Sequence, residues 1–145
     1  IDWSLRVKQL DTLRQGEPIE MPQSSYVECA RSKETTRVEP TQVIIVEGIL
    51  IFTDKELLKR LDIKVFVDAE SDERLTRIIR RDTVERGRDC MQVLDHYGKW
   101  VKPMHLQFIE PTKRYADIIV PQGGENKVAV QILASRIQMK LGSGE

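Results

Sequence analysis

Two carboxylates follow short apolar runs, where they could take part in phosphate chemistry. Glu47 comes directly after the run 43–46 and before Gly48, and Asp68 ends the run 63–68. Ligands of open parallel sheets bind beyond the carboxyl ends of the strands, where a carboxylate can hold Mg²⁺ or one of its waters. The competing interpretation is structural: Glu47 could cap the next helix or face solvent, and Asp68 is better explained as a helix cap.

The stretch 80–89, RRDTVERGRD, is a second place where phosphate chemistry is possible. Its arginines are Arg80, Arg81, Arg86 and Arg88. Planar guanidinium groups match the phosphoryl oxygens on which charge develops during transfer, and Gly87 could be the hinge of a lid. The alternative is a solvated helix face held by ion pairs between residues three and four apart, and composition alone favours that alternative.

The remaining reactive side chains form no further signature. His96 and His105 stand alone, and Cys29 and Cys90 are far apart, so neither a metal site nor a disulfide framework is indicated. The phosphate-binding loop GxxxxGK[ST] does not occur in the chain. These residues by themselves therefore build no complete P-loop nucleotide site.

The composition limits the possible classes of function. With 145 residues, of which 40% are hydrophobic, the chain can form one domain or part of one. The 23 basic and 23 acidic residues balance, which argues against a general binder of nucleic acid or anionic membranes. No apolar run reaches the ~18 residues that span a bilayer, and the cysteine usage favours a reducing, cytoplasmic setting. The chain opens at Ile1 in a helical pattern, which suggests the later part of a longer protein.

Hydrophobic periodicity predicts alternating helices and strands. Helices are expected over 2–15, 54–61, 70–86, 89–109 and 126–140, with Pro103 interrupting the fourth. Asp2 is the candidate N-cap of the first helix and Gly16 its stop, and Asp54 lies near the start of the second. Buried strands are expected in 42–52, 63–68 and 117–120, and a β-hairpin-like excursion over 19–39. This order predicts an α/β fold with a parallel, doubly wound sheet. Three core strands are few for such a sheet, which again suggests that an N-terminal part is absent.

Several blocks of the sequence together carry a resemblance. They are VIIVEGIL (43–50), the stretch 63–89 with ERGRD, the stretch 101–124 with PTKRYADIIVP, the final helix, and PQSSYVECARSKETTRVEP (22–40). In this combination the chain resembles the uridine–cytidine kinase family of P-loop phosphotransferases over essentially its whole length. The fold that this implies is a parallel doubly wound sheet of the P-loop nucleoside-kinase type, with a β-hairpin at 19–39 and a helical lid over 74–96.

The resemblance also implies an activity. Such an enzyme uses ATP and Mg²⁺ to phosphorylate the 5′-hydroxyl of uridine or cytidine to UMP or CMP, in cytoplasmic pyrimidine salvage. Its partner is a small-molecule nucleoside rather than a nucleic acid or a membrane, and the resemblance implies a homo-oligomer, a tetramer. Residues 1–145 would be one partial kinase domain, the C-terminal two-thirds of the enzyme. The P-loop, its lysine and the aspartate general base would precede Ile1, so the chain alone is expected to be inactive.

Matched residue by residue, the resemblance implies roles for particular side chains. Arg81 and Arg86 match lid arginines that face the ATP phosphates and are the expected catalytic residues. Glu47 matches the magnesium-associated glutamate. The expected substrate-binding residues are Tyr26 against the base, Ile49 on an apolar wall of the nucleoside pocket, Arg88 near the ribose, and His96. Arg80 is expected to face solvent.

The departures from the family pattern fall in the nucleoside pocket. Ser24 replaces a tyrosine, Cys29 a histidine or tyrosine, Ile78 an arginine that helps to bind the nucleoside, and His96 a glutamine. Each hydrogen bond lost to a buried base costs about 1–3 kcal/mol where partners stay unpaired. A related kinase with a changed small-molecule substrate is therefore the first alternative. The second is a non-catalytic oligomerising module, if the chain truly begins at Ile1.

Overall fold

The computed structural model describes residues 1–25 and 30–142 of the chain. It divides into two compact units, Ile1–Glu47 and Gly48–Glu145, and each is described by itself. Within the described ranges, no helix combines the length and the apolar character that a membrane crossing needs.

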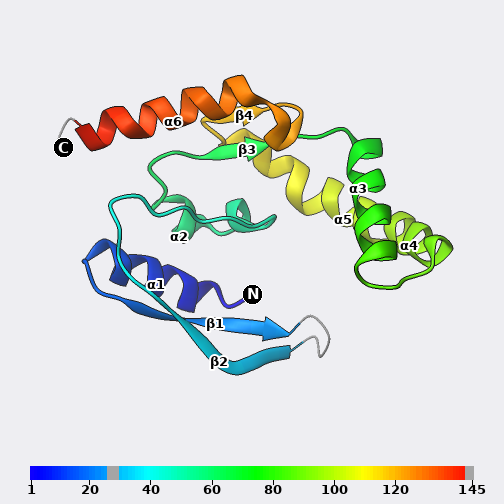
Figure 1. Cartoon of the computed structure of the whole chain (residues 1–145), viewed down its shortest axis with the longest axis horizontal. Helices are drawn as coiled ribbons and strands as arrows, with labels where there is room; N and C mark the ends of the chain where they lie inside the picture. The colour runs from blue at the N-terminus through cyan, green and yellow to red at the C-terminus, as the bar shows by residue number, and fades with distance from the viewer. Residues whose placement is uncertain (26–29, 143–145) are drawn as a thin grey trace. The chain divides into compact units, whose positions relative to one another are not determined.

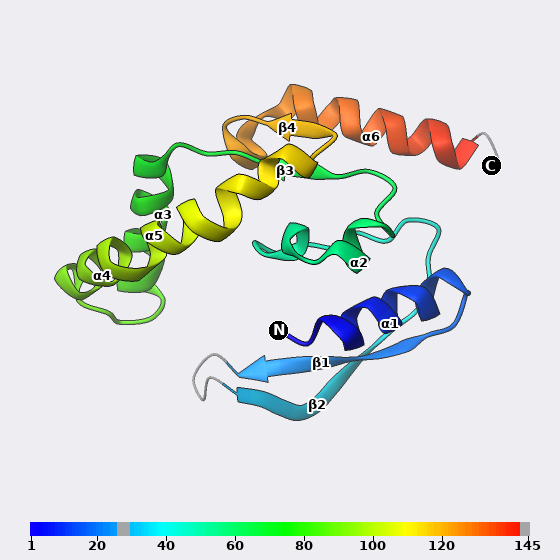
Figure 2. The ribbon, with the colours of Figure 1, turned by 180° about the vertical axis from the view of Figure 1, so that it is seen from behind.

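The first unit opens with the amphipathic helix that the sequence predicts. Helix α1 spans Trp3–Arg14, and Oδ1 of Asp2 accepts a hydrogen bond from a backbone N–H of its first turn at 3.0 Å, so Asp2 is the expected N-cap. Gly16, at φ 83°, ends the helix in the left-handed conformation that glycine adopts without strain. Leu10 and Leu13 are buried, and α1 lies alongside strand β1 (Figures 1 and 2).

Two antiparallel strands complete the first unit. Strand β1 spans Ile19–Ser25 and β2 spans Ala30–Val38, with Ile19 opposite Val38 and a shift in register after Pro22 (Figure 1). Proline has no backbone N–H to donate to a ladder, which suits it to an irregular position of an edge strand. The side chains of β2 are mostly exposed, so this ribbon is held chiefly by its backbone ladder and by α1.

The stretch 43–47 corrects one expectation. The sequence predicts a buried strand within 42–52, but these residues form neither strand nor helix, and Ile45 is 81% exposed. A strand is stabilised by a neighbour that pairs with its backbone N–H and C=O groups. No segment among the described residues pairs with this stretch, so its apolar content alone does not make it a strand. The chain then continues into a short 3₁₀ helix, Ile51–Thr53.

A small parallel sheet lies in the second unit and confirms the α/β class. Strand β3 spans Val65–Val67 and β4 spans Ile118–Val120, and they pair in parallel with Phe66 opposite Ile119. Phe66 and Val120 are buried. Both strands are shorter than the sequence predicts, and the described residues contain two parallel strands where three were expected.

Helix α2, Lys55–Leu58, supplies the most deeply buried side chain of the second unit. Oδ1 of Asp54 accepts the backbone N–H of Leu57 at 2.7 Å, which confirms Asp54 near the start of this helix. Leu57 itself is 0% exposed and lies in the same unit as the buried Phe52. The helix is one turn long, about half of the predicted range.

Helix α3 spans Ser71–Val84 and begins without the expected side-chain cap. Glu70 occupies the N-cap position and its side chain makes no capping hydrogen bond. The interpretation of Asp68 as the cap of this helix is therefore wrong. Oδ2 of Asp68 instead accepts a hydrogen bond from Nζ of Lys113 at 2.6 Å, because the parallel pairing of β3 with β4 brings a distant segment to the end of the strand.

The predicted helix over 89–109 is a chain of short helical pieces. They are α4 (Cys90–His96), a π-helical turn (Tyr97–Val101), α5 (Lys102–Met104), a second π-helical turn (His105–Ile109) and a 3₁₀ helix (Glu110–Tyr115). The N–H of Lys102 donates to the carbonyl of Tyr97, five residues back. The ladder thus changes its spacing beside Pro103, which has no N–H to donate. The second unit ends with α6, Lys127–Gly142 (Figure 1).

Candidate functional site

Three arginines meet one buried carboxylate at the end of α3. Nε of Arg81 lies 2.8 Å from Oδ1 of Asp82, an Arg86 guanidinium nitrogen lies 3.3 Å from the same oxygen, and one of Arg88 lies 3.1 Å from Oδ2. We call these four residues the arginine cluster. Asp82 is 3% exposed, whereas the side chains of the arginines are 45%, 38% and 50% exposed in chain order. The cluster therefore has a buried anion and a half-exposed cationic surface.

The local sequence explains why these side chains come together. Helix α3 ends at Val84, and Gly87, at φ 61°, turns the chain in a left-handed conformation. The turn lets the backbone N–H of Arg88 donate to the carbonyl oxygen of Asp82 at 3.0 Å. Asp89 then begins α4 by accepting two backbone N–H groups, at 2.9 and 3.2 Å. The order helix, glycine turn, capped helix thus brings the last arginine back toward the carboxylate.

The charges of the cluster favour an anionic partner. Burial by itself raises the pKa of the Asp82 carboxyl, but the hydrogen bond from Arg81 and the charges of the two other guanidinium groups outweigh it and hold the pKa below its usual value. Asp82 is therefore ionised at neutral pH and compensates one of three positive charges. The exposed N–H groups of the arginines can donate to further oxygens, as guanidinium groups do to phosphates.

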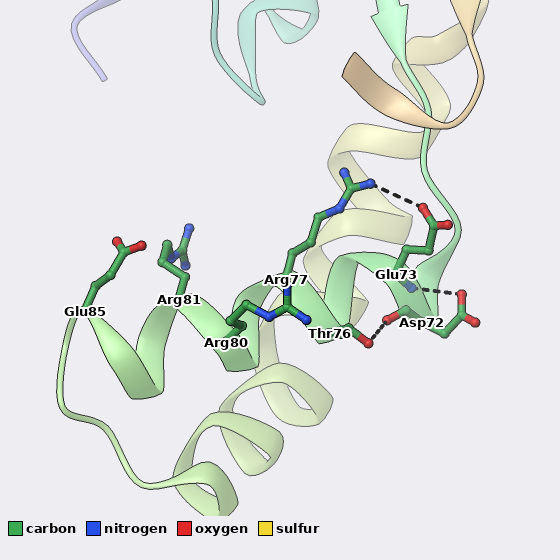
Figure 3. A pocket seen from close by; sticks show the side chains of 7 residues that line it. All are labelled: Asp72, Glu73, Thr76, Arg77, Arg80, Arg81 and Glu85. Carbon is green, nitrogen blue, oxygen red and sulfur yellow. Dashed lines mark hydrogen bonds and ion pairs between the residues drawn. The ribbon is translucent and has the colours of Figure 1, made fainter. Parts of the chain in front are cut away.

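A hollow of about 500 Å³ runs along α3 next to the cluster (Figure 3). Its lining residues are Asp72, Glu73, Thr76, Arg77, Arg80, Arg81 and Glu85. Arg77 pairs with Glu73 at 3.4 Å across one turn of the helix. Acidic groups lie at both ends of this lining and arginines lie between them, and the pair of Arg77 with Glu73 has the four-residue spacing at which side chains meet on a helix. We assign this hollow no ligand.

A second polar network lies at the carboxyl edge of the small sheet. Lys113 pairs with Asp68 at 2.6 Å and with Glu110 at 3.5 Å, and Glu110 also lies 3.2 Å from Nε2 of His105. The hydrogen bond to Asp68 raises the pKa of Lys113. The residues around Lys113 in the sequence do not indicate this role, because its partner Asp68 lies 45 residues away.

The same edge brings α3 to the loop after β4. The backbone N–H of Gly123 donates to the carbonyl oxygen of Asp68 at 3.0 Å. A Cβ at Gly123 would lie 3.2 Å from a guanidinium nitrogen of Arg77, and its φ of 66° is left-handed. The left-handed conformation therefore favours glycine here, whereas the guanidinium of Arg77, at the end of a flexible side chain, could move aside by a few tenths of an ångström.

Glu47 is the last residue of the first unit, and Ile49 is the second residue of the second unit. Both are exposed, Ile49 at 77%, and neither belongs to a helix or strand. Among the described residues Glu47 has no hydrogen bond or ion pair, and no group of three or more His, Cys, Asp or Glu side chains could hold a metal ion. A single carboxylate with free oxygens suits Mg²⁺, which is usually bound by one or two carboxylates together with substrate phosphates.

The other expected site residues are less informative. Tyr26 and Cys29 lie outside the described residues. His96 is the last residue of α4 and is exposed, and Ser24 lies in β1 opposite Arg31. Ile78 is half-buried on α3. Of the expected site residues, the structure thus gathers Arg81, Arg86 and Arg88 around one carboxylate.

Comparisons with known proteins agree on one family. Residues 1–129 match the family model described as the Phosphoribulokinase / Uridine kinase family. The chain is 53% identical over 137 residues to a uridine kinase of Limosilactobacillus reuteri (strain DSM 20016), covering 94% of this chain and 63% of that protein. It is 52% identical over 143 residues to a uridine kinase of Oceanobacillus iheyensis, covering 99% of this chain and 68% of the relative. A uridine kinase of Pectobacterium atrosepticum is 50% identical over 137 residues, with 94% and 64% covered. The chain thus spans roughly two-thirds of the curated relatives that it matches.

Proposed function

This chain belongs to the phosphoribulokinase / uridine kinase family, and from that premise we propose that the full-length protein phosphorylates the 5′-hydroxyl of uridine or cytidine. The phosphate donor is ATP and the products are UMP or CMP and ADP. The observation that carries the proposal is the arginine cluster, whose half-exposed guanidinium groups are arranged around Asp82. Because phosphoryl transfer depends on positioning and charge stabilisation, such a cluster is suited to the reaction.

In this proposal Arg81 and Arg86 are the catalytic residues. Their guanidinium groups donate hydrogen bonds to the phosphate oxygens and stabilise the charge that develops there during transfer. The 5′-oxygen of the nucleoside forms the new bond to the γ-phosphorus, the bond from that phosphorus to the bridging oxygen breaks, and ADP leaves. The hydroxyl proton passes to a general base. By family resemblance this base is an aspartate, and it is none of the residues named above.

Glu47 is the proposed magnesium-associated residue. Its exposed carboxylate, which has no partner in the described part of the chain, offers the oxygen ligands that Mg²⁺ prefers. When bound, Mg²⁺ neutralises charge on the donor phosphates. Glu47 either contacts the ion directly or orients one of its waters.

The nucleoside is bound by a different set of side chains. We assign Arg88 to the ribose, Ile49 to an apolar wall, Tyr26 to the base and His96 to a polar contact. Arg88 shares Asp82 with the two catalytic arginines, so the ribose and the phosphates would meet one cluster from two sides. We further propose that the enzyme acts in cytoplasmic pyrimidine salvage as a homo-oligomer, a tetramer by family resemblance, and that it binds no nucleic acid or membrane.

A related kinase with a changed substrate is the second candidate, and Ile78 is the observation that favours it. This residue offers no hydrogen-bond donor where the family has an arginine, and it is half-buried on α3. A nucleoside that is left with unpaired polar groups binds more weakly by about 1–3 kcal/mol per lost bond. Substrate choice could therefore differ while phosphate handling stays the same.

The deciding experiment is a phosphorylation assay with a panel of nucleosides. The full-length protein, as its gene encodes it, is incubated with ATP, Mg²⁺ and each nucleoside, and the nucleoside monophosphate is quantified; the 145-residue chain is the control. We expect uridine or cytidine to be phosphorylated by the full-length protein alone. Turnover of another nucleoside only would support the second candidate. No turnover of any nucleoside would contradict phosphorylation of uridine or cytidine and would leave a kinase for a substrate other than a nucleoside, or a non-catalytic oligomerising module.

A further inference from the structure

We propose that Asp82 is a positioning residue of the phosphate site: its buried carboxylate holds the guanidinium groups of Arg81, Arg86 and Arg88 together, so that they meet the phosphate donor as one surface. This inference rests on the proposed function, because it assumes that the arginines bind phosphate. Asp82 itself touches no substrate, since it is only 3% exposed.

The geometry around Asp82 carries the inference. Both carboxylate oxygens are occupied: Oδ1 receives Arg81 at 2.8 Å and Arg86 at 3.3 Å, and Oδ2 receives Arg88 at 3.1 Å. Asp82 is also the buried residue of α3, whose other side chains are half-buried or exposed. A buried carboxylate that is bonded through both oxygens restricts the positions of its partner side chains more than an exposed ion pair does.

The three arginines would separate without a common anion. Arg81 belongs to α3, Arg86 lies in the turn after it, and Arg88 lies directly before the cap of α4. Three like charges within reach of one carboxylate repel one another, and that repulsion is strongest away from bulk water. The side chains of the three arginines stay 38% to 50% exposed, so part of each guanidinium reaches the surface. Asp82 therefore sets where the cationic surface lies.

A protease digest tests the anchoring without any assumption about the reaction. Trypsin cleaves after arginine, and the Arg86–Gly87 bond lies in the turn that Asp82 holds. In the full-length protein we expect Asp82→Asn to speed cleavage at this bond about fivefold, because cleavage follows the population of the opened turn. The matched control is Asp95→Asn, the same change at an exposed position of α4, which should stay within about twofold of wild type. Equal cleavage rates in the two variants overturn the proposal.

A double-mutant cycle tests whether the anchoring serves catalysis. We expect Asp82→Asn and Arg86→Ala each to lower kcat/KM for ATP. If the two changes were independent, the fold loss of kcat/KM in the double variant would equal the product of the two single losses; we expect it to be at least about threefold smaller than that product. Such non-additivity means that Asp82 acts through the arginine, whereas a purely structural defect would multiply with the loss of Arg86. Multiplicative losses therefore overturn the positioning role.

A conservative variant covers the case in which Asp82→Asn does not fold. Asp82→Glu keeps the charge and moves the carboxylate by one methylene, so the cluster forms in a displaced position. We expect KM for ATP to rise about threefold or more with a cooperative thermal transition retained. Unchanged kinetics overturn the proposal.

Faster cleavage of Asp82→Asn in a protein that phosphorylates no nucleoside would instead overturn the proposed function and leave the anchoring intact.

Discussion

Glu47 and Asp82 are two carboxylates of one chain with opposite environments. Asp82 is buried at the end of a helix and accepts hydrogen bonds or ion pairs from three arginines. Glu47 is exposed, lies outside any helix or strand, and has no hydrogen bond or ion pair among the described residues. One carboxylate is saturated by its own chain, and the other keeps its oxygens free.

The contrast separates residues that build a site from residues that meet a ligand. The partners of Asp82 lie within six residues of it in the sequence, so a helix end and a glycine turn suffice to assemble the cluster. Such a carboxylate is buried and engaged on both oxygens, so it is poorly placed to bind a metal ion. An exposed carboxylate without partners costs little to keep in water and can exchange that water for a cation. Substitutions at the two positions should therefore fail in different ways.

The largest expected effect is on turnover at Glu47. In Glu47→Gln we expect kcat of the full-length protein to fall about 100-fold, because the proposed Mg²⁺ would lose a charged ligand or the group that orients one of its waters. The free energy of unfolding should change by less than about 0.5 kcal/mol, since the residue is exposed. Steady-state kinetics over a range of Mg²⁺ concentrations, together with urea denaturation, checks both statements. If Glu47→Gln lowered the free energy of unfolding and left kcat unchanged, Glu47 would be a structural residue like Asp82 and not a residue that meets a ligand.

Arg86 should show the next largest effect. We expect Arg86→Ala to reduce kcat/KM for ATP at least about tenfold, because one charge that stabilises the phosphoryl oxygens is lost. Arg80→Ala is the matched control, since Arg80 is exposed on the same stretch and takes no part in the ion pairs of Asp82; its kcat/KM should stay within about twofold. Similar losses in both variants would point to general electrostatic attraction rather than to a defined site.

Ile78 tests the nucleoside side and should show a smaller change. We expect Ile78→Arg to lower KM for uridine or cytidine about fivefold, because it restores the donor that the family resemblance implies at this position. KM for ATP should remain the same. The measurement is a nucleoside titration at saturating ATP. An unchanged KM for every pyrimidine nucleoside would mean that the pocket has been remodelled beyond this one residue.

The smallest expected effect is a pH dependence of stability. The folded state lowers the pKa of Asp82, so its ionised form stabilises the fold above the unfolded pKa of about 3.9 and that contribution is lost as pH falls through the lower folded value. The difference in unfolding free energy between wild type and Asp82→Asn should be constant from pH 7 to about pH 5 and shrink below about pH 4. Urea denaturation at each pH measures it, and a constant difference down to pH 3 would contradict the role of the charge.

Signals that act over a few residues were predictable from the sequence. The caps at Asp2 and Asp54 and the stop at Gly16 follow from local hydrogen bonding and from the conformational freedom of glycine. The same holds for the alternation of apolar runs and amphipathic helices that predicted an α/β fold. The ion-pair alternative for the stretch 80–89 was also available, and the pair of Arg86 with Asp82 has the four-residue spacing that it names.

The order of residues along the chain is enough to identify the family, the helix caps and the arginine-rich turn. Packing in three dimensions is what buries Asp82, pairs Asp68 with Lys113 instead of with the start of α3, and leaves the stretch 43–47 without a strand partner among the described residues. Burial, strand pairing and the meeting of residues 45 positions apart depend on which segments pack together. A local pattern records what a residue can do, whereas its neighbours in space determine what it does.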